Sequence, residues 1–94
     1  MQKFIDELKS YGNSEIENHK PTVDKTLDQF TRMGKYLTDY GFKWGQMVTL
    51  MRTKKEEIIE RAKNLGFDTT GLNEILDEVM FEVKKNFKEK YAPK

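Results

Sequence analysis

The chain has 94 residues, of which 36% are hydrophobic and 35% are charged, so we expect one small domain over residues 1–94 with little interior. The net charge of +1 lacks the basic excess of a dedicated duplex-DNA binder, and the absence of cysteine excludes disulfides and thiol chemistry. No secretory signal is recognisable, and the longest uncharged apolar stretch, residues 44–51, is too short to cross a bilayer. We therefore expect a cytoplasmic protein that does not enter the membrane.

Two short helices are predicted at the start of the chain. Over residues 2–11, four apolar residues fall on one helical face: Phe4, Ile5, Leu8 and Tyr11. Gly12 follows, and glycine is typical of a helix C-terminus. Ser14 and Glu17 then form a capping-box pattern, which predicts a second helix over residues 14–20.

A long central helix is predicted over residues 22–65. Pro21 is either its first residue or a kink that joins it to the preceding helix. Gly41 resembles a helix end, but residues 42–46 contain no Ser, Thr, Asp or Asn that could cap a new helix. We expect the helix to continue, with a bend allowed near Gly41–Gly45. A break at Gly41 is the alternative, and it would give a compact four-helix bundle.

The last helix is predicted over residues 71–91. Leu65-Gly66 marks the end of the central helix, and Asp68, Thr69 and Thr70 are cap candidates for the next one. Its apolar residues share a broad face: Leu72, Ile75, Leu76, Val79, Met80, Val83 and Phe87. The predicted fold is all-α, with a short N-terminal helix, a long central helix and a C-terminal helix folded back antiparallel.

An apolar residue recurs every seven positions through most of the chain: Ile16, Val23, Phe30, Leu37, Trp44, Met51, Ile58, Leu65, Leu72 and Val79. A second row four residues further on includes Leu27, Gly34, Gly41 and Val48. Together the rows have the spacing of a helix-packing seam. Glycine in the second row would let another helix, or a large ring, approach the backbone closely.

The length of the central helix predicts a partner. Forty-four residues at 1.5 Å each make a rod of about 66 Å, roughly twice the diameter of a compact domain of this size. We expect the C-terminal helix to cover only Met51–Leu65. The uncovered half predicts a homo-oligomer, dimeric or higher, that forms through five apolar residues: Val23, Leu27, Phe30, Leu37 and Trp44.

Signals of catalysis or metal binding are weak. His19 is the only histidine, and Glu15 lies four residues before it on the same helical face. No third ligand and no HExxH motif accompany them, so we expect a solvated His19 and no metal site. Nucleophile-elbow, Walker and dinucleotide-binding patterns do not occur. We expect no catalytic residues, no cofactor and no enzymatic activity.

One cluster of aromatic and basic residues could contact a ligand or partner: Tyr36, Tyr40, Lys43, Trp44 and Arg52. One interpretation is an interface core with solvated lysines nearby. A second is an adaptable protein-binding surface together with Met47, Leu50 and Met51. A third is a site in which rings stack on bases and cations pair with phosphates, for a nucleotide or single-stranded nucleic acid.

These patterns favour a non-enzymatic, self-associating helical interaction protein. It would act as a regulator or inhibitor by binding another macromolecule, most simply another protein. The alternative is an oligomer that binds or sequesters an anionic small molecule, such as a nucleotide, in an aromatic and basic pocket between subunits.

Overall fold

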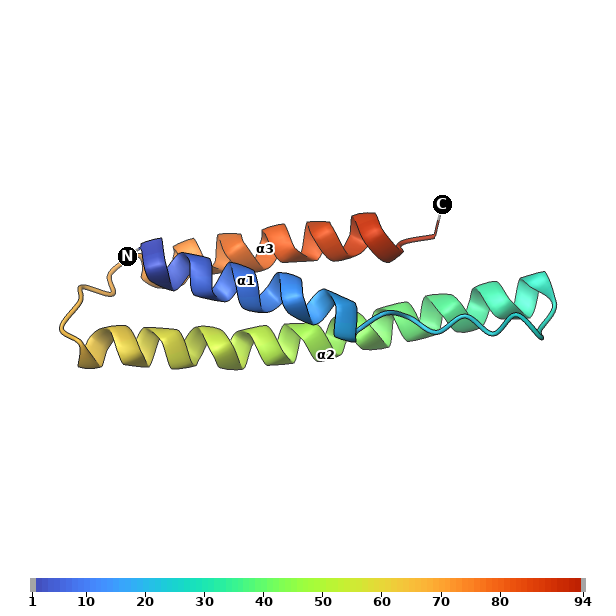
Figure 1. Cartoon of the computed structure of the whole chain (residues 1–94), viewed down its shortest axis with the longest axis horizontal. Helices are drawn as coiled ribbons and strands as arrows, with labels where there is room; N and C mark the ends of the chain where they lie inside the picture. Colours follow the sequence, from blue (N-terminus) through green and yellow to red (C-terminus); the bar gives the residue numbers. More distant parts are fainter. Residues whose placement is uncertain (1, 94) are drawn as a thin grey trace.

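The computed structural model describes residues 2–93, which form three helices: α1 (Gln2–Asn18), α2 (Gln29–Asn64) and α3 (Leu72–Tyr91) (Figure 1). α1 and α3 lie side by side on the C-terminal half of α2, and all three helices pack against one another. α3 runs antiparallel to α2 (Figure 1). The predicted all-α fold, with a long central helix and a C-terminal helix folded back, is confirmed.

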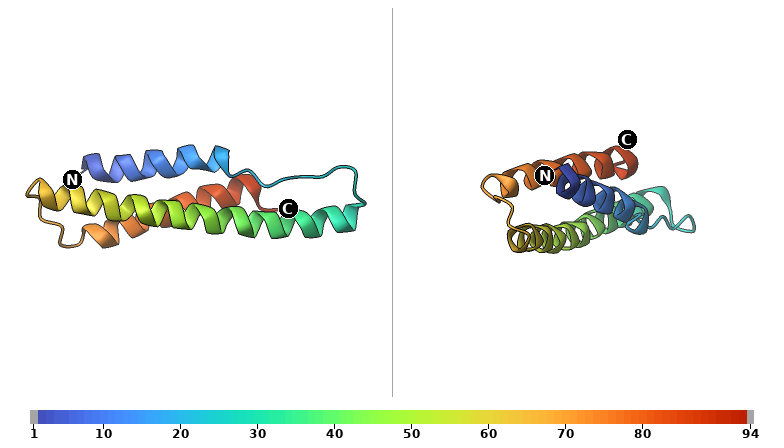
Figure 2. Two further views of the ribbon diagram at one scale, coloured as in Figure 1. Left: turned by 90° about the horizontal axis from the view of Figure 1, so that it is seen from below. Right: turned by 60° about the vertical axis from the view of Figure 1, so that its left-hand side comes forward.

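The molecule is a rod. Its extents are 57 × 19 × 17 Å, and its radius of gyration of 16.2 Å exceeds the value of about 12 Å for a compact domain of this length. The N-terminal part of α2 extends beyond both other helices in each view (Figures 1 and 2). Residues 19–28 lie beside this part of α2, as a non-helical segment that we name the strap.

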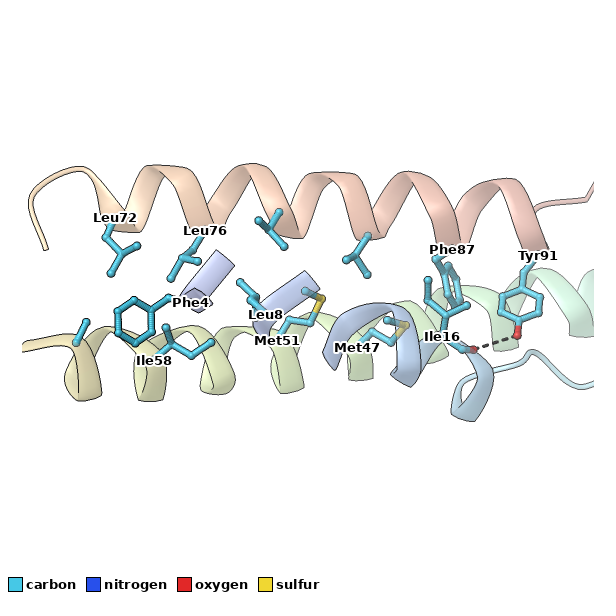
Figure 3. Packing of buried hydrophobic residues seen from close by; sticks show 13 residues of the cluster. Phe4, Leu8, Ile16, Met47, Met51, Ile58, Leu72, Leu76, Phe87 and Tyr91 are labelled. Atoms are coloured by element: carbon cyan, nitrogen blue, oxygen red, sulfur yellow. Dashed lines mark hydrogen bonds between the residues drawn. The ribbon is translucent and has the colours of Figure 1, made fainter. Parts of the chain in front are cut away.

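The hydrophobic core lies between the three helices, where each contributes one apolar stripe (Figure 3). Tyr91 closes one end of this core, and its hydroxyl donates a 3.0 Å hydrogen bond to the carbonyl oxygen of Ile16. The buried residues are Phe4, Leu8, Ile16, Met47, Met51, Ile58, Ala62, Leu72, Leu76, Val79, Val83, Phe87 and Tyr91.

The predicted break at Gly12 is wrong, because α1 runs unbroken from Gln2 to Asn18 in place of helices over 2–11 and 14–20. Gly12 is buried where the three helices meet. A Cβ atom there would lie 2.7 Å from Met51 Cε and 2.8 Å from Val83 Cγ2. Both distances are shorter than a normal contact between two carbon atoms. Glycine at this position therefore allows close helix packing and does not end a helix.

The predicted start of the central helix at residue 22 is also wrong, because α2 begins at Gln29. Asp28 is its N-cap, and its carboxylate accepts a 3.0 Å hydrogen bond from the Thr31 amide. Upstream, the amide and the hydroxyl of Thr26 both donate to Asp24 Oδ1, at 3.0 and 2.6 Å. These local bonds satisfy the backbone in a turn, so they compete with helix formation.

The strap follows the N-terminal half of α2 and is attached to it by polar and apolar contacts. The Thr22 amide donates a 2.6 Å hydrogen bond to Asp39 Oδ2 of α2. Pro21 is buried within the strap, so it neither starts α2 nor kinks a helix. The chain thus reverses direction through ten residues of non-helical backbone, which carry Val23 and Leu27 away from the predicted helical seam.

Continuity through Gly41 is confirmed, and the four-helix alternative with a break there is excluded. Among residues 2–93, positive φ angles occur only at Gly66 and Gly71, in the turn between α2 and α3. The Phe67 amide donates back to the Ala62 carbonyl at 3.0 Å, closing the end of α2 as the Leu65-Gly66 pattern predicts. Gly71, with φ 78°, takes the N-cap position of α3.

Candidate interaction surface

The first three turns of α2 expose large apolar side chains. Phe30 is 91% exposed, the highest value for a large apolar residue among residues 2–93, and Leu37 and Met33 are 48% and 43% exposed. α1 has ended at Asn18, and α3 ends at Tyr91, whose carbonyl oxygen accepts a hydrogen bond from Tyr36, so neither helix extends to the N-terminus of α2 (Figure 1). This end of α2 is therefore not buried within its own chain.

Four residues of this region share one side of α2, which we name the open face: Phe30, Gly34, Leu37 and Gly41. At 100° per residue they fall within about 60° of one another around the helix axis. Arg32, Lys35 and Asp39 point about 120–180° away from this side by the same count. The strap is bonded to Asp39 on the far side of α2, and it borders the open face only at Gly34, which lines a depression together with Thr22 and Asp24.

The two glycines of the open face border empty space. A Cβ atom built at Gly34 or Gly41 would meet no atom within 4 Å. At position 12, by contrast, a Cβ atom would lie less than 3 Å from each of two side chains. Packing within one chain therefore explains the glycine at position 12 but not those at positions 34 and 41, nor the one at position 45, which also borders empty space.

Trp44 lies closer to the core than predicted. Its ring centroid is 5.5 Å from that of Phe87, and Lys84 Nζ lies 5.8 Å from the indole centroid. The expectation that α3 covers only Met51–Leu65 is wrong, because Phe87 of α3 packs on the rings of Tyr40 and Trp44.

The residues predicted for self-association fall into three environments. Phe30 and Leu37 are exposed on the open face, as described above. Val23 is 47% exposed and Leu27 half-buried, both on the strap. Trp44 is half-buried against α3. The structure thus separates one exposed pair from residues that already have intramolecular contacts.

Of the five residues predicted for ligand contact, the structure gathers the three aromatic ones around the last turns of α3 but does not bring Lys43 and Arg52 to one side of α2. The Tyr36 hydroxyl donates a hydrogen bond to the Tyr91 carbonyl, and the Tyr40 ring packs 5.3 Å from Phe87. Arg52 comes nine residues after Lys43, which places the two on opposite sides of α2. A nucleotide site between subunits stays a prediction, since the five residues form no single pocket here.

A second exposed patch, which the seven-residue rhythm misses, lies on the outer side of α3. Phe81 is 72% exposed, and Lys84, Lys85 and Lys88 follow it at helical spacing on the exposed surface. The four residues line a shallow depression together. Sequence reasoning overlooks Phe81 because it falls outside the apolar rows that mark the core.

His19 is buried, so the prediction of a solvated histidine is wrong. Because α1 continues to Asn18, His19 folds back on the last turn, and its Nδ1 lies 2.8 Å from the Glu15 carbonyl oxygen. Its Nδ1 is 3.6 Å from the Glu15 carboxylate. Over residues 2–93, no three His, Asp or Glu side chains gather in a group that could hold a metal ion.

One ion-pair network ties α1 to α2. Arg61 donates to both carboxylate oxygens of Glu7, at 2.6 and 2.9 Å, and to Glu57 at 3.0 Å. Lys54 approaches Glu7 at 3.5 Å. The hydrogen bonds from Arg61 lower the pKa of Glu7 below its usual 4.5, since they favour the charged carboxylate.

The Glu7 network predicts a dependence of stability on pH. A carboxyl group whose pKa is lowered in the folded state stabilises that state above its unfolded pKa, and this contribution is lost as pH falls through the folded pKa. We expect Glu7→Gln to reduce the difference in unfolding free energy between pH 7 and pH 3, measured by urea denaturation. Glu78→Gln is the control, because Glu78 is exposed and makes no ion pair with any described residue. An equal change in both variants would contradict the assignment.

No family model, curated protein or solved structure matches the chain. The described helices include none with the length and hydrophobicity that a bilayer span requires. Together the fold and surface define an elongated three-helix protein with one uncovered apolar helix face.

Proposed function

We propose that this chain is a non-enzymatic, self-associating helical interaction protein. In this proposal it acts in the cytoplasm, as a regulator or inhibitor, by binding another protein. The observation that carries the proposal is the open face, where Phe30 is 91% and Leu37 48% exposed. A contiguous exposed apolar patch on a soluble protein marks a site of interaction.

The energetics favour association through this face. Fully burying one Phe or Leu side chain stabilises by about 1.5–3 kcal/mol, and a symmetric dimer would bury two such residues from each chain. The charged neighbours Arg32, Lys35 and Asp39 point away from the open face, so pairing there would bury no unpaired charge. The glycines at 34 and 41 let a second backbone come close.

The patch around Phe81 supports binding of a further macromolecule. It lies on α3 and not on the open face of α2, so we expect a dimer formed through the open face to leave Phe81 accessible. An exposed phenyl ring beside Lys84, Lys85 and Lys88 suits an acidic protein segment with an apolar residue. The absence of cysteine is compatible with a reducing compartment.

Light scattering in line with size exclusion tests self-association. We expect a mass of about 22 kDa at high concentration, twice the 11.1 kDa of one chain. Phe30→Asp is expected to give a monomer with unchanged helicity, because the introduced carboxylate cannot be buried unpaired. Phe81→Asp is the matched control and is expected to stay dimeric. A monomeric wild type at every concentration would rule out the proposal.

A further inference from the structure

We propose that the open face binds a second copy of this chain antiparallel, about a two-fold axis that passes between Lys35 and Tyr36. Phe30 then packs on Gly41 of the second copy, and Leu37 packs on its Gly34. This inference rests on the proposed self-association and gives it a partner, a direction and a register. The second copy is the occupant because the open face is complementary to itself.

The self-complementarity lies in the spacing. The four residues follow one another at intervals of four, three and four, which reads the same in both directions. In a two-fold interface, if residue i contacts residue j, then j also contacts i. Antiparallel pairing about the axis between 35 and 36 therefore sets each large side chain against a glycine. Parallel pairing would set Phe30 against Phe30 and leave gaps at the glycines.

The glycines supply the second argument. Glycine inside a helix is less stable than alanine, so an exposed helical glycine needs a reason. At Gly34 and Gly41 no atom beyond the surrounding backbone of α2 lies within 4 Å of the point where a Cβ atom would stand, so packing in the folded monomer gives none. In the antiparallel pair, these two spaces receive Leu37 and Phe30 of the second copy.

The shape of the rod also favours the antiparallel direction. α1 and α3 lie along the C-terminal part of α2, and α3 ends where its Tyr91 carbonyl oxygen accepts the Tyr36 hydroxyl, so neither helix extends to the N-terminus of α2 (Figures 1 and 2). A second α2 that runs antiparallel over residues 29–42 carries its own α1 and α3 away from those of the first copy. Parallel pairing would bring both bundles to the same end, where they would compete for space.

The size of the contact sets the expected affinity. An overlap of residues 29–42 is about 21 Å of helix. A single helix pair of this length buries less surface than a standard interface, which buries roughly 800 Å² per partner. We expect a dissociation constant that is roughly micromolar, so the dimer fraction should change over ordinary laboratory concentrations.

An exchange of large and small residues tests the register. Gly34→Leu sets leucine against leucine, and we expect it to weaken the dimer by at least about tenfold in sedimentation equilibrium. The same change should raise the denaturation midpoint of the dilute monomer, because it replaces an exposed helical glycine. Adding Leu37→Gly to the same chain restores large against small, and the dissociation constant should return to within about threefold of the wild type. Gly45→Leu, outside the overlap, should leave it unchanged.

Each outcome bears on the register or on self-association. If Phe30→Asp dissociates the dimer but Gly34→Leu does not, the register is overturned while the proposed function stands. The register is also overturned if the double variant fails to recover. A wild type that remains monomeric removes both proposals.

Cross-linking gives an independent measurement, since the chain has no cysteine of its own. Gly34→Cys and Leu37→Cys chains are mixed and oxidised. Antiparallel pairing predicts a disulfide between the two different variants, because opposed positions bring Cα atoms within the roughly 4.4–6.8 Å that a disulfide needs. Disulfides formed mainly between identical variants would show parallel pairing and overturn the proposal.

Discussion

Gly12→Leu is expected to lower the free energy of unfolding by at least about 3 kcal/mol, from a total of about 5–14 kcal/mol for a chain of this length. Even a single Cβ at position 12 would lie 2.8 Å from Val83 Cγ2 and 2.7 Å from Met51 Cε. The methionine end can rotate away, but the branched valine on α3 is held in the core, where it is fully buried. A leucine would therefore force α1 away from both other helices.

Gly12→Ala and Gly45→Ala separate this packing effect from helix propensity. Both changes improve helix propensity by about 1 kcal/mol, but nothing lies within 4 Å of a Cβ at Gly45. Gly45→Ala should therefore raise the unfolding free energy, while Gly12→Ala should lower it. Urea denaturation at low micromolar concentration, followed by circular dichroism, measures both. Equal stabilisation by the two alanines would show that α1 does not approach α2 and α3 as closely as the structure has it.

The course of α1 illustrates why one glycine could not be interpreted from the sequence. Glycine marks both a helix end and a close helix contact, since both require a missing Cβ. Ser14 and Glu17 complete a capping pattern in either case, and only the positions of Met51 and Val83 decide between the two. Those positions depend on contacts more than thirty residues away in the chain.

The start of α2 was unpredictable for a different reason. Val23 continues the seven-residue rhythm, so periodicity alone extends the helix through the strap. Hydrogen bonds from Thr26 to Asp24 and from Thr31 to Asp28 stop it. Such local bonds are individually weak, and tertiary contacts such as that of Thr22 with Asp39 determine which conformation forms.

The apolar rhythm predicted which side of each helix is apolar but not what covers it. Met51 and Ile58 are buried in the core, while Phe30 and Leu37, in the same row, are exposed. For two of the candidate ligand residues, helical spacing alone predicts that they lie far apart. The separation of nine positions from Lys43 to Arg52 already places them on opposite sides of a continuous helix.

Phe87→Ala is expected to cost about 3–5 kcal/mol of unfolding free energy, the range for removing a buried phenyl ring. Phe87 is 1% exposed and contacts three other rings: Tyr40 at 5.3 Å, Trp44 at 5.5 Å and Tyr91 at 5.1 Å between centroids. Such aromatic pairs contribute about 0.5–1.5 kcal/mol each beyond the area they bury. Removing the ring thus leaves a cavity and also detaches the last turns of α3 from α2.

Phe81→Ala is the matched control, because it removes the same residue type from the same helix at a position 72% exposed. Its effect should stay within about 0.5 kcal/mol. Trp44 is the only tryptophan, so its fluorescence reports directly on the neighbourhood of Phe87. In the folded Phe87→Ala variant its emission should shift to longer wavelength, since water gains access to the indole. Similar losses in the two variants, or an unshifted spectrum, would mean that α3 does not pack on the middle of α2, and the exposed part of α2 would then be longer than the open face.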